Sequence, residues 1–228
     1  LRARAHLAQA AFAHVSRYDA TVAAYLASVA GDPLPDAVAL PLTKVRSLSY
    51  GENPHQAAAL YRFADQQLTG PGLADLIQHS GEAPSYNNLL DLDCAQAIVS
   101  DFPEPAVAIV KHNNPCGVGT GDTVEDAYRR AYAGDPLSAF GGVVASNRVV
   151  DAPMARAMSG VLFWVMVAPG YSQDALRIFA RRQTRVFTLP GASGGARLPA
   201  FGWQFRPVSG GFLAQSPDAV PAEGITFA

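Results

Sequence analysis

The chain has 228 residues, of which 49% are hydrophobic and 16% charged, enough to bury the core of one large domain. Its 17 basic and 19 acidic residues leave a net charge of −2, which argues against a broad nucleic-acid footprint but permits a local anion pocket. No run of 18 apolar residues predicts a membrane span, and two cysteines make no disulfide framework, which suits a reduced cytoplasmic setting.

The first third of the chain is predicted to be irregular in places, because turn-forming residues interrupt it. Gly31 and Pro33 end an Ala-rich helical pattern, and Gly51 and Pro54 prevent any regular element in the stretch SYGENPHQ. The predicted order is a helix, a linker, an extended segment, a loop and a strand, at residues 1–28, 31–37, 38–48, 49–56 and 58–63.

From residue 85 to residue 189, helical patterns alternate with short apolar runs. This alternation predicts βαβ units and a parallel or mixed sheet between helices. We expect helices capped by Ser85 or Asn87, by Asp122 or Thr123, and by Asp151. The predicted helices are 85–100, 121–135, 151–158 and 172–183, and the predicted strands are 106–110, 140–147, 161–169 and 185–189. A Gly-rich loop at 191–202 and two short extended pieces after 203 follow.

The stretch AVAIVKHNNPCGVGTG, residues 106–121, ends a buried-looking strand on Lys111 and His112. Ligands of open α/β sheets gather at the carboxyl ends of strands, but adjacent strand residues point to opposite faces. Both side chains can therefore meet one ligand only if the chain bends here. Lys111 would then disfavour protonation of His112, leaving a neutral general base, and would itself stabilise an oxyanion. The alternative is a solvated lysine and a core histidine.

Other stretches allow both a structural and a functional interpretation. Cys116 follows a proline as in zinc deaminases, but no second cysteine or His-x-Glu accompanies it, so we expect no metal and a packed thiol. GVGTGD lacks the full spacing of a nucleotide-binding glycine motif and predicts a turn. Gly141, in SAFGGVV, allows either the close approach of a ligand or a bulge. Asn87 and Asn88 either bind a ligand or cap a helix.

Five separated motifs together resemble one enzyme family. They occur in its order and spacing, and they are SLSYGENPHQAAALYR, SYNNLLDLDCAQAIV, AIVKHNNPCGVG, DAYRRAYAGDPLSAFGGVVASNR and VMVAPGYSQDAL. The chain is similar, from residue 1 to about 215, to the bifunctional purine-biosynthesis enzymes that join AICAR formyltransferase to IMP cyclohydrolase.

The resemblance implies a domain organisation and a fold. Residues 1–30 correspond to the last helix of the cyclohydrolase domain, 31–37 to a linker, and 38–228 to the first half of the formyltransferase domain. The implied fold is a three-layer α/β/α, cytidine deaminase-like arrangement around a mixed sheet, without the zinc of the deaminases. Leu1 is not a methionine, and we expect a piece of a longer, cytoplasmic chain that forms homodimers and binds neither nucleic acid nor a membrane.

The resemblance also implies a reaction, the transfer of a formyl group from 10-formyltetrahydrofolate to AICAR in de novo purine biosynthesis. His112 corresponds to the residue that takes the proton from the attacking amine, and Lys111 to the one that steadies the developing charge. Tyr50 and Gly141 match nucleotide-contacting positions, with Asn88 as a further candidate. The full family also cyclises the product to IMP.

Three positions depart from the family pattern. Ser49 stands where an arginine precedes the tyrosine, Trp164 where the family has an acid, and Ser209 where a basic residue precedes two glycines. A guanidinium offers an anion a bidentate charged fork that a hydroxyl does not. These departures leave two hypotheses open, a formyltransferase part that works through Lys111 and His112, and a non-catalytic nucleotide-binding or dimer-forming remnant.

Overall fold

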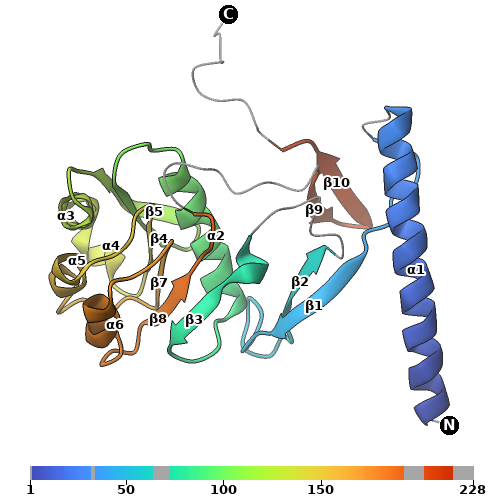
Figure 1. Cartoon of the computed structure of the whole chain (residues 1–228), viewed down its shortest axis with the longest axis horizontal. Coiled ribbons are helices and arrows are strands. Elements are labelled where there is room, and N and C mark those ends of the chain that lie inside the picture. The colour runs from blue at the N-terminus through green and yellow to red at the C-terminus, as the bar shows by residue number, and fades with distance from the viewer. Residues whose placement is uncertain (1, 32–33, 64–71, 193–202, 218–228) are drawn as a thin grey trace, which may run out of the picture.

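The computed structural model describes residues 2–31, 34–63, 72–192 and 203–217. A six-stranded sheet forms the centre of the larger part of the molecule. Figure 1 shows this sheet flanked by helices, with the long helix α1 (Arg2–Ala30) set apart beyond the ribbon of β1 (Leu42–Ser47) and β2 (Ala59–Phe63). The ribbon pairs these two strands, and a second hairpin pairs β9 (Gln204–Val208) with β10 (Gly211–Gln215). Among the described helices, none is long and apolar enough to cross a membrane.

The main sheet is mixed, in the order β3-β8-β7-β6-β4-β5. Strands β6, β7 and β8 run parallel, whereas β4 is antiparallel to β5 and β6, and β3 is antiparallel to β8. The strands are β3 (Ile77–Ser80), β4 (Ala106–Lys111), β5 (Asn114–Thr120), β6 (Val143–Ser146), β7 (Val165–Ala168) and β8 (Arg185–Thr188). This confirms the expected α/β class and mixed sheet.

Alternation along the strands builds one core on each face of the sheet. In β4, Val107 and Ile109 face one core, and Ala106, Ala108 and Val110 face the other, all of them fully buried. The second core is covered by α2 (Tyr86–Ser100), and the first by α3 (Val124–Gly134), α5 (Ala152–Ala157) and α6 (Gln173–Phe179). The helices therefore lie on both sides of the sheet, as Figure 1 shows.

Three helix caps that the sequence predicts are confirmed. Ser85, Thr123 and Asp151 each accept a hydrogen bond from the backbone N–H three residues on, and thereby begin α2, α3 and α5. Gly31 ends α1 in the left-handed conformation, with φ of 71°. The short elements η2 (Leu73–Asp75), β3 and α4 (Pro136–Ala139) were not predicted, and residues 193–202 of the predicted Gly-rich loop lie outside the described residues.

The glycines after Pro115 form strand β5 and not the predicted turn. A Cβ atom on Gly117 would lie 1.9 Å from the carbonyl oxygen of Ala131, and one on Gly119 would lie 2.4 Å from that of Ala127. Both carbonyls belong to α3, which packs directly on the strand. The glycines therefore allow a helix to approach the sheet closely, which the sequence alone did not distinguish from a turn.

Replacing Ser85 with alanine is expected to lower the free energy of unfolding by about 1 kcal/mol, because the N-cap hydroxyl of α2 is lost. Ser85 Oγ accepts from the Asn88 N–H at 3.2 Å, and Asn88 Oδ1 accepts from the Ser85 N–H at 3.2 Å. Urea unfolding measures the change. The matched control, Ser209→Ala at an exposed serine, is expected to stay within about 0.5 kcal/mol of the wild type. Equal losses at both serines would contradict the capping account.

Candidate functional site

Strand β4 ends in a tight hairpin turn that carries the predicted Lys-His pair. Lys111 pairs with Asn114 across the hairpin, so His112 and Asn113 form a two-residue loop. Both have positive φ, 55° and 58°, which is the backbone of a type I′ turn. The chain therefore bends directly after Lys111. A bend at this position is the condition under which the side chains of Lys111 and His112 could both contact one ligand.

Asp91 of α2 binds the backbone of the turn. The sequence did not mark this residue as a candidate. The Asp91 carboxylate accepts hydrogen bonds from the backbone N–H of His112 at 3.2 Å and of Asn113 at 2.7 Å. Asp91 is only 9% exposed. Nothing in LLDLDCAQ marks this aspartate among other polar residues of a helix, because its partners lie more than 20 positions away.

The Lys111 ammonium group extends from the strand end toward the next segment of the site. Its Nζ donates to the carbonyl oxygen of Phe140 at 2.8 Å, directly before Gly141. Gly141 has φ of 77°, in the left-handed region that favours glycine, and its N–H donates to the Leu162 carbonyl at 2.8 Å. None of the ion pairs in the described part of the chain involves Lys111, so its charge is available to an anionic group.

Trp164 lies against Gly141 and is held there by a cation. Its indole Nε1 is 3.2 Å from the place that a Cβ atom on Gly141 would occupy. The guanidinium carbon of Arg185 lies 5.9 Å from the centre of the indole ring, a cation–π arrangement, and Trp164 remains 40% exposed. The structure therefore brings Lys111, Gly141 and Trp164 together at one end of the inner strands, where β4 ends and β6 and β7 begin.

The SYGENPHQ loop docks on the first turn of the same helix that holds the hairpin turn. The Tyr86 N–H donates to the Tyr50 carbonyl at 3.1 Å, and Asn87 Nδ2 donates to the Glu52 carbonyl at 3.2 Å. Asn87 and Asp91 are four residues apart and share one face of α2, separated by about 6 Å along its axis. Two motifs that are about 60 residues apart in sequence are therefore fixed one helical turn apart.

The remaining predicted binding residues differ in the exposure and the hydrogen bonding of their side chains. Tyr50 is 39% exposed, and Ser49 is exposed with its N–H bonded to the Pro84 carbonyl at 3.2 Å. The Asn88 side chain takes part in the capping box with Ser85, so its contacts favour helix capping over ligand binding.

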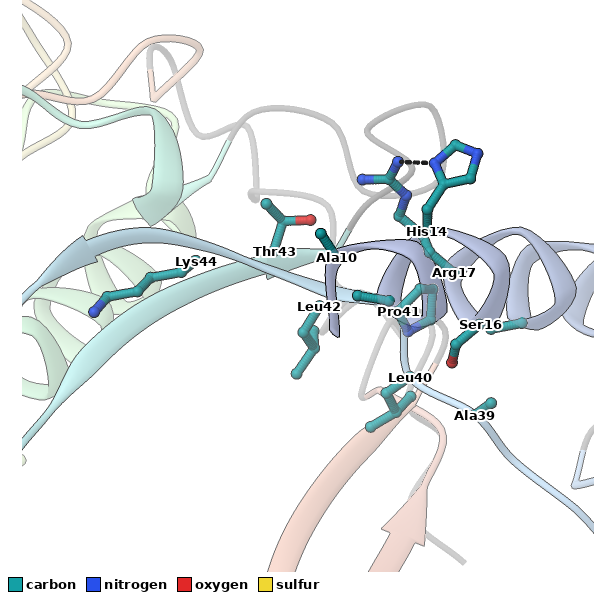
Figure 2. Close-up of a pocket in the computed structure, with 12 residues that line it drawn as sticks. Ala10, His14, Ser16, Arg17, Ala39, Leu40, Pro41, Leu42, Thr43 and Lys44 are labelled. Carbon is teal, nitrogen blue, oxygen red and sulfur yellow. Dashed lines mark hydrogen bonds between the residues drawn. The ribbon is translucent and has the colours of Figure 1, made fainter. Parts of the chain in front are cut away.

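Surface hollows lie beside the SYGENPHQ loop and beside α1. One, of about 350 Å³, is lined by the SYGENPHQ loop and Tyr86. The other, of about 580 Å³, separates α1 from residues 39–44. Figure 2 shows that Lys44 extends away from this second hollow, while His14 and Arg17 contact each other, with 3.5 Å between the imidazole and guanidinium nitrogens. Its polar side chains do not converge on one point, so it presents no organised binding site.

The thiols near the hairpin are suited to packing rather than to chemistry. Burial, and then the Asp135 carboxylate, raise the pKa of Cys116, which keeps the thiol protonated near neutral pH. Burial likewise raises the pKa of Cys94, whose Sγ donates to the Asn113 carbonyl at 3.7 Å. In the described ranges, no group of three or more His, Cys, Asp or Glu side chains is placed to hold a metal ion.

Comparison with known proteins identifies the family. The model of the AICARFT/IMPCHase bienzyme family matches residues 1–227. Proteins named bifunctional purine biosynthesis protein PurH are 45% identical over 226 residues in Acidithiobacillus ferrooxidans and in a Cyanothece species, and 42% identical over 222 residues in Cutibacterium acnes. Each alignment covers 96% of this chain but only 41–42% of the relative, so the chain spans about two fifths of their length. By both comparisons, the chain belongs to the AICARFT/IMPCHase bienzyme family.

Proposed function

We propose that this chain contributes the AICAR-binding part of an AICAR formyltransferase, with Lys111 and His112 as the catalytic pair. The observation that carries the proposal is the turn after β4, which presents both side chains at a strand end while Lys111 reaches the backbone beside Gly141. Among the described residues, Lys111 has no carboxylate in an ion pair with it, and such a cation at the end of β4 suits the recognition of an anionic or electron-rich ligand.

The proposed reaction moves a formyl group from 10-formyltetrahydrofolate to the 5-amino group of AICAR. The amine nitrogen attacks the formyl carbon, a new C–N bond forms, the bond from that carbon to the folate nitrogen breaks, and that nitrogen takes up a proton to leave as tetrahydrofolate. His112 takes the proton from the attacking amine as general base, and Lys111 stabilises the negative charge that develops on the formyl oxygen. No metal takes part. Tyr50, Gly141 and Ser49 would contact the nucleotide, and Trp164 would border its place over Gly141.

The domain organisation is part of the same proposal. Residues 1–30 would be the last helix of an IMP cyclohydrolase domain, 31–37 a linker, and 38–228 the first, cytidine deaminase-like half of the formyltransferase domain. An exposed stripe of large apolar side chains on α1 supports the first assignment, because such a stripe needs a covering surface. It comprises Leu7, Phe12, Val15, Tyr18, Val22, Tyr25, Leu26 and Val29. We further propose a cytoplasmic homodimer that binds neither nucleic acid nor membrane.

A second candidate function is a nucleotide-binding or dimer-forming remnant without turnover. Ser49 and Trp164 favour it. Ser49 offers one neutral hydroxyl at a position where the resemblance implies a guanidinium, and Trp164 places an indole over Gly141. This candidate keeps the binding of AICAR but not the transfer of the formyl group.

Calorimetric titration of the purified chain with AICAR tests the proposed function, followed by an assay for tetrahydrofolate release with 10-formyltetrahydrofolate. Saturable AICAR binding supports the proposed site, and turnover in addition excludes the remnant. A folded chain that gives no binding heat with AICAR, while its circular dichroism matches the helix and strand content described above, would contradict both.

Replacing Trp164 with alanine is expected to tighten AICAR binding about threefold to tenfold, because the indole occupies the space over Gly141 that a nucleotide needs. The same titration measures the change. Trp203, which stacks edge to face on Phe205 in the distant β9 hairpin, offers the matched control, and Trp203→Ala should leave the affinity unchanged. Weaker binding by Trp164→Ala would show instead that the indole stacks on the ligand.

A further inference from the structure

The carboxylate of Asp91 is the contact that determines the geometry of the His112–Asn113 turn. It receives both backbone N–H groups of the turn, at 3.2 and 2.7 Å, from a side chain that is 9% exposed. Hydrogen bonds to a charged acceptor are stronger than neutral ones, and a buried carboxylate requires such partners. Neither Asp91 nor this contact follows from the function proposed above.

The turn needs an external anchor because its own residues do not favour it strongly. A two-residue type I′ turn requires positive φ at both positions and is typically formed by Asn-Gly, Asp-Gly or Gly-Gly. Here His112 and Asn113 adopt φ of 55° and 58° without a glycine. Asparagine tolerates this region well, but each non-glycine residue in it stores strain that the surroundings must hold.

Asp91 stands on a rigid support. It lies on the second turn of α2, whose Leu89, Leu92 and Ala95 are buried in the core beneath the sheet. The Asn114 side chain closes the turn from the other side, because its Nδ2 donates to the His112 carbonyl at 2.8 Å. The backbone of His112 is thus held at its N–H by Asp91 and at its carbonyl by Asn114.

We propose that Asp91 is a positioning residue for the Lys111–His112 pair, one that touches no substrate and acts by fixing the turn that carries His112 and begins directly after Lys111. This inference rests on the proposed AICAR site. Since Asn87, one turn earlier on the same face, holds the SYGENPHQ loop through the Glu52 carbonyl, α2 would set the spacing between the two halves of that site.

The test replaces Asp91 with asparagine, which has nearly the same shape but presents an NH₂ group to one of the two N–H donors. We expect the amides of His112 and Asn113 to exchange with solvent at least about tenfold faster in Asp91→Asn, as measured by NMR, while the amides of β4 and β6 stay protected. AICAR binding should weaken by at least about tenfold. The control is Asp93→Asn on the same helix, at a residue that is exposed overall although burial raises the pKa of its carboxyl, and it should change neither quantity.

A second-site variant separates positioning from a general loss of structure. Asn113→Gly favours the type I′ backbone by itself, so Asp91→Asn combined with Asn113→Gly should recover most of the lost AICAR affinity. The double variant also provides a folded sample if Asp91→Asn alone does not fold. Recovery supports positioning, and a double variant as weak as the single one overturns it.

The exchange rates and the AICAR affinity test different parts of the proposal. Exchange rates at His112 and Asn113 that do not change in Asp91→Asn overturn the anchor, whatever the binding result. A wild-type chain that does not bind AICAR overturns the proposed function and, with it, the role of Asp91 there. Faster exchange with full AICAR affinity overturns positioning while leaving the proposed function intact.

Discussion

Replacing Gly117 with alanine is expected to lower the free energy of unfolding by about 3 kcal/mol or more. The new Cβ atom would lie 1.9 Å from the carbonyl oxygen of Ala131, a backbone atom that no rotamer change can move. Relief requires the displacement of α3, which carries the buried Val124, Ala127, Tyr128 and Ala131 into the core. Closely packed interiors transmit such a shift to their neighbours.

Chemical denaturation with urea, followed by circular dichroism, measures this loss. Gly72 provides a matched control, because a Cβ atom there meets nothing within 4 Å and its φ of −156° is ordinary extended backbone. Gly72→Ala should change the stability by less than about 0.5 kcal/mol. A Gly117→Ala protein as stable as the wild type would show that β5 and α3 do not pack as closely as described.

Replacing both Lys111 and His112 with alanine is expected to weaken AICAR binding by about 100-fold or more. A hydrogen bond to a charged group contributes about 1.5–3 kcal/mol, or roughly tenfold to 100-fold in affinity, and Lys111 alone accounts for one such contact. Because the partner of the Lys111 ammonium group within the described residues is a backbone carbonyl, its removal leaves none of the described carboxylates unpaired. The fold should therefore survive the double substitution.

The chain offers a matched control for the loss of one lysine and one histidine. Lys44 and His14 line the hollow beside α1 and are exposed, far along the chain from the hairpin turn. Their double alanine variant removes the same charges and should bind AICAR as the wild type does. If both double variants lost affinity equally, the effect would reflect net charge, and the assignment of Lys111 and His112 would be wrong.

Local signals in the sequence were sufficient for most of the fold. Short apolar runs predicted the strands at 106–110 and 185–189, and helical patterns predicted the helices that begin after Ser85 and Asp151, all of which the structure contains. These elements depend on contacts between near neighbours and on burial on both faces. The short strand Ile77–Ser80 was missed because it has only four residues and lies at the edge of the sheet, where alternation is weak.

Contacts between distant residues were not predictable in the same way. Gly117 and Gly119 suggested a turn. A glycine in the sequence does not show whether the fold uses its backbone freedom or its lack of a side chain, nor which backbone packs against it. The Asp91 anchor joins a helix to a turn more than 20 residues later, and Arg185 reaches Trp164 from a different strand. The bend at His112 was expected, but the residue that holds it follows only from the folded structure.

A two-dimensional NMR titration of the labelled chain with AICAR is the most direct test of the proposed AICAR site. We expect the signals of the Trp164 indole N–H and of the backbone amides of Lys111, His112 and Gly141 to shift together and saturate at one affinity, while the amide signals of α1 and of residues 39–44 do not shift. Shifts confined to the hollow between α1 and residues 39–44, or no shifts in a folded chain, would contradict the proposed site.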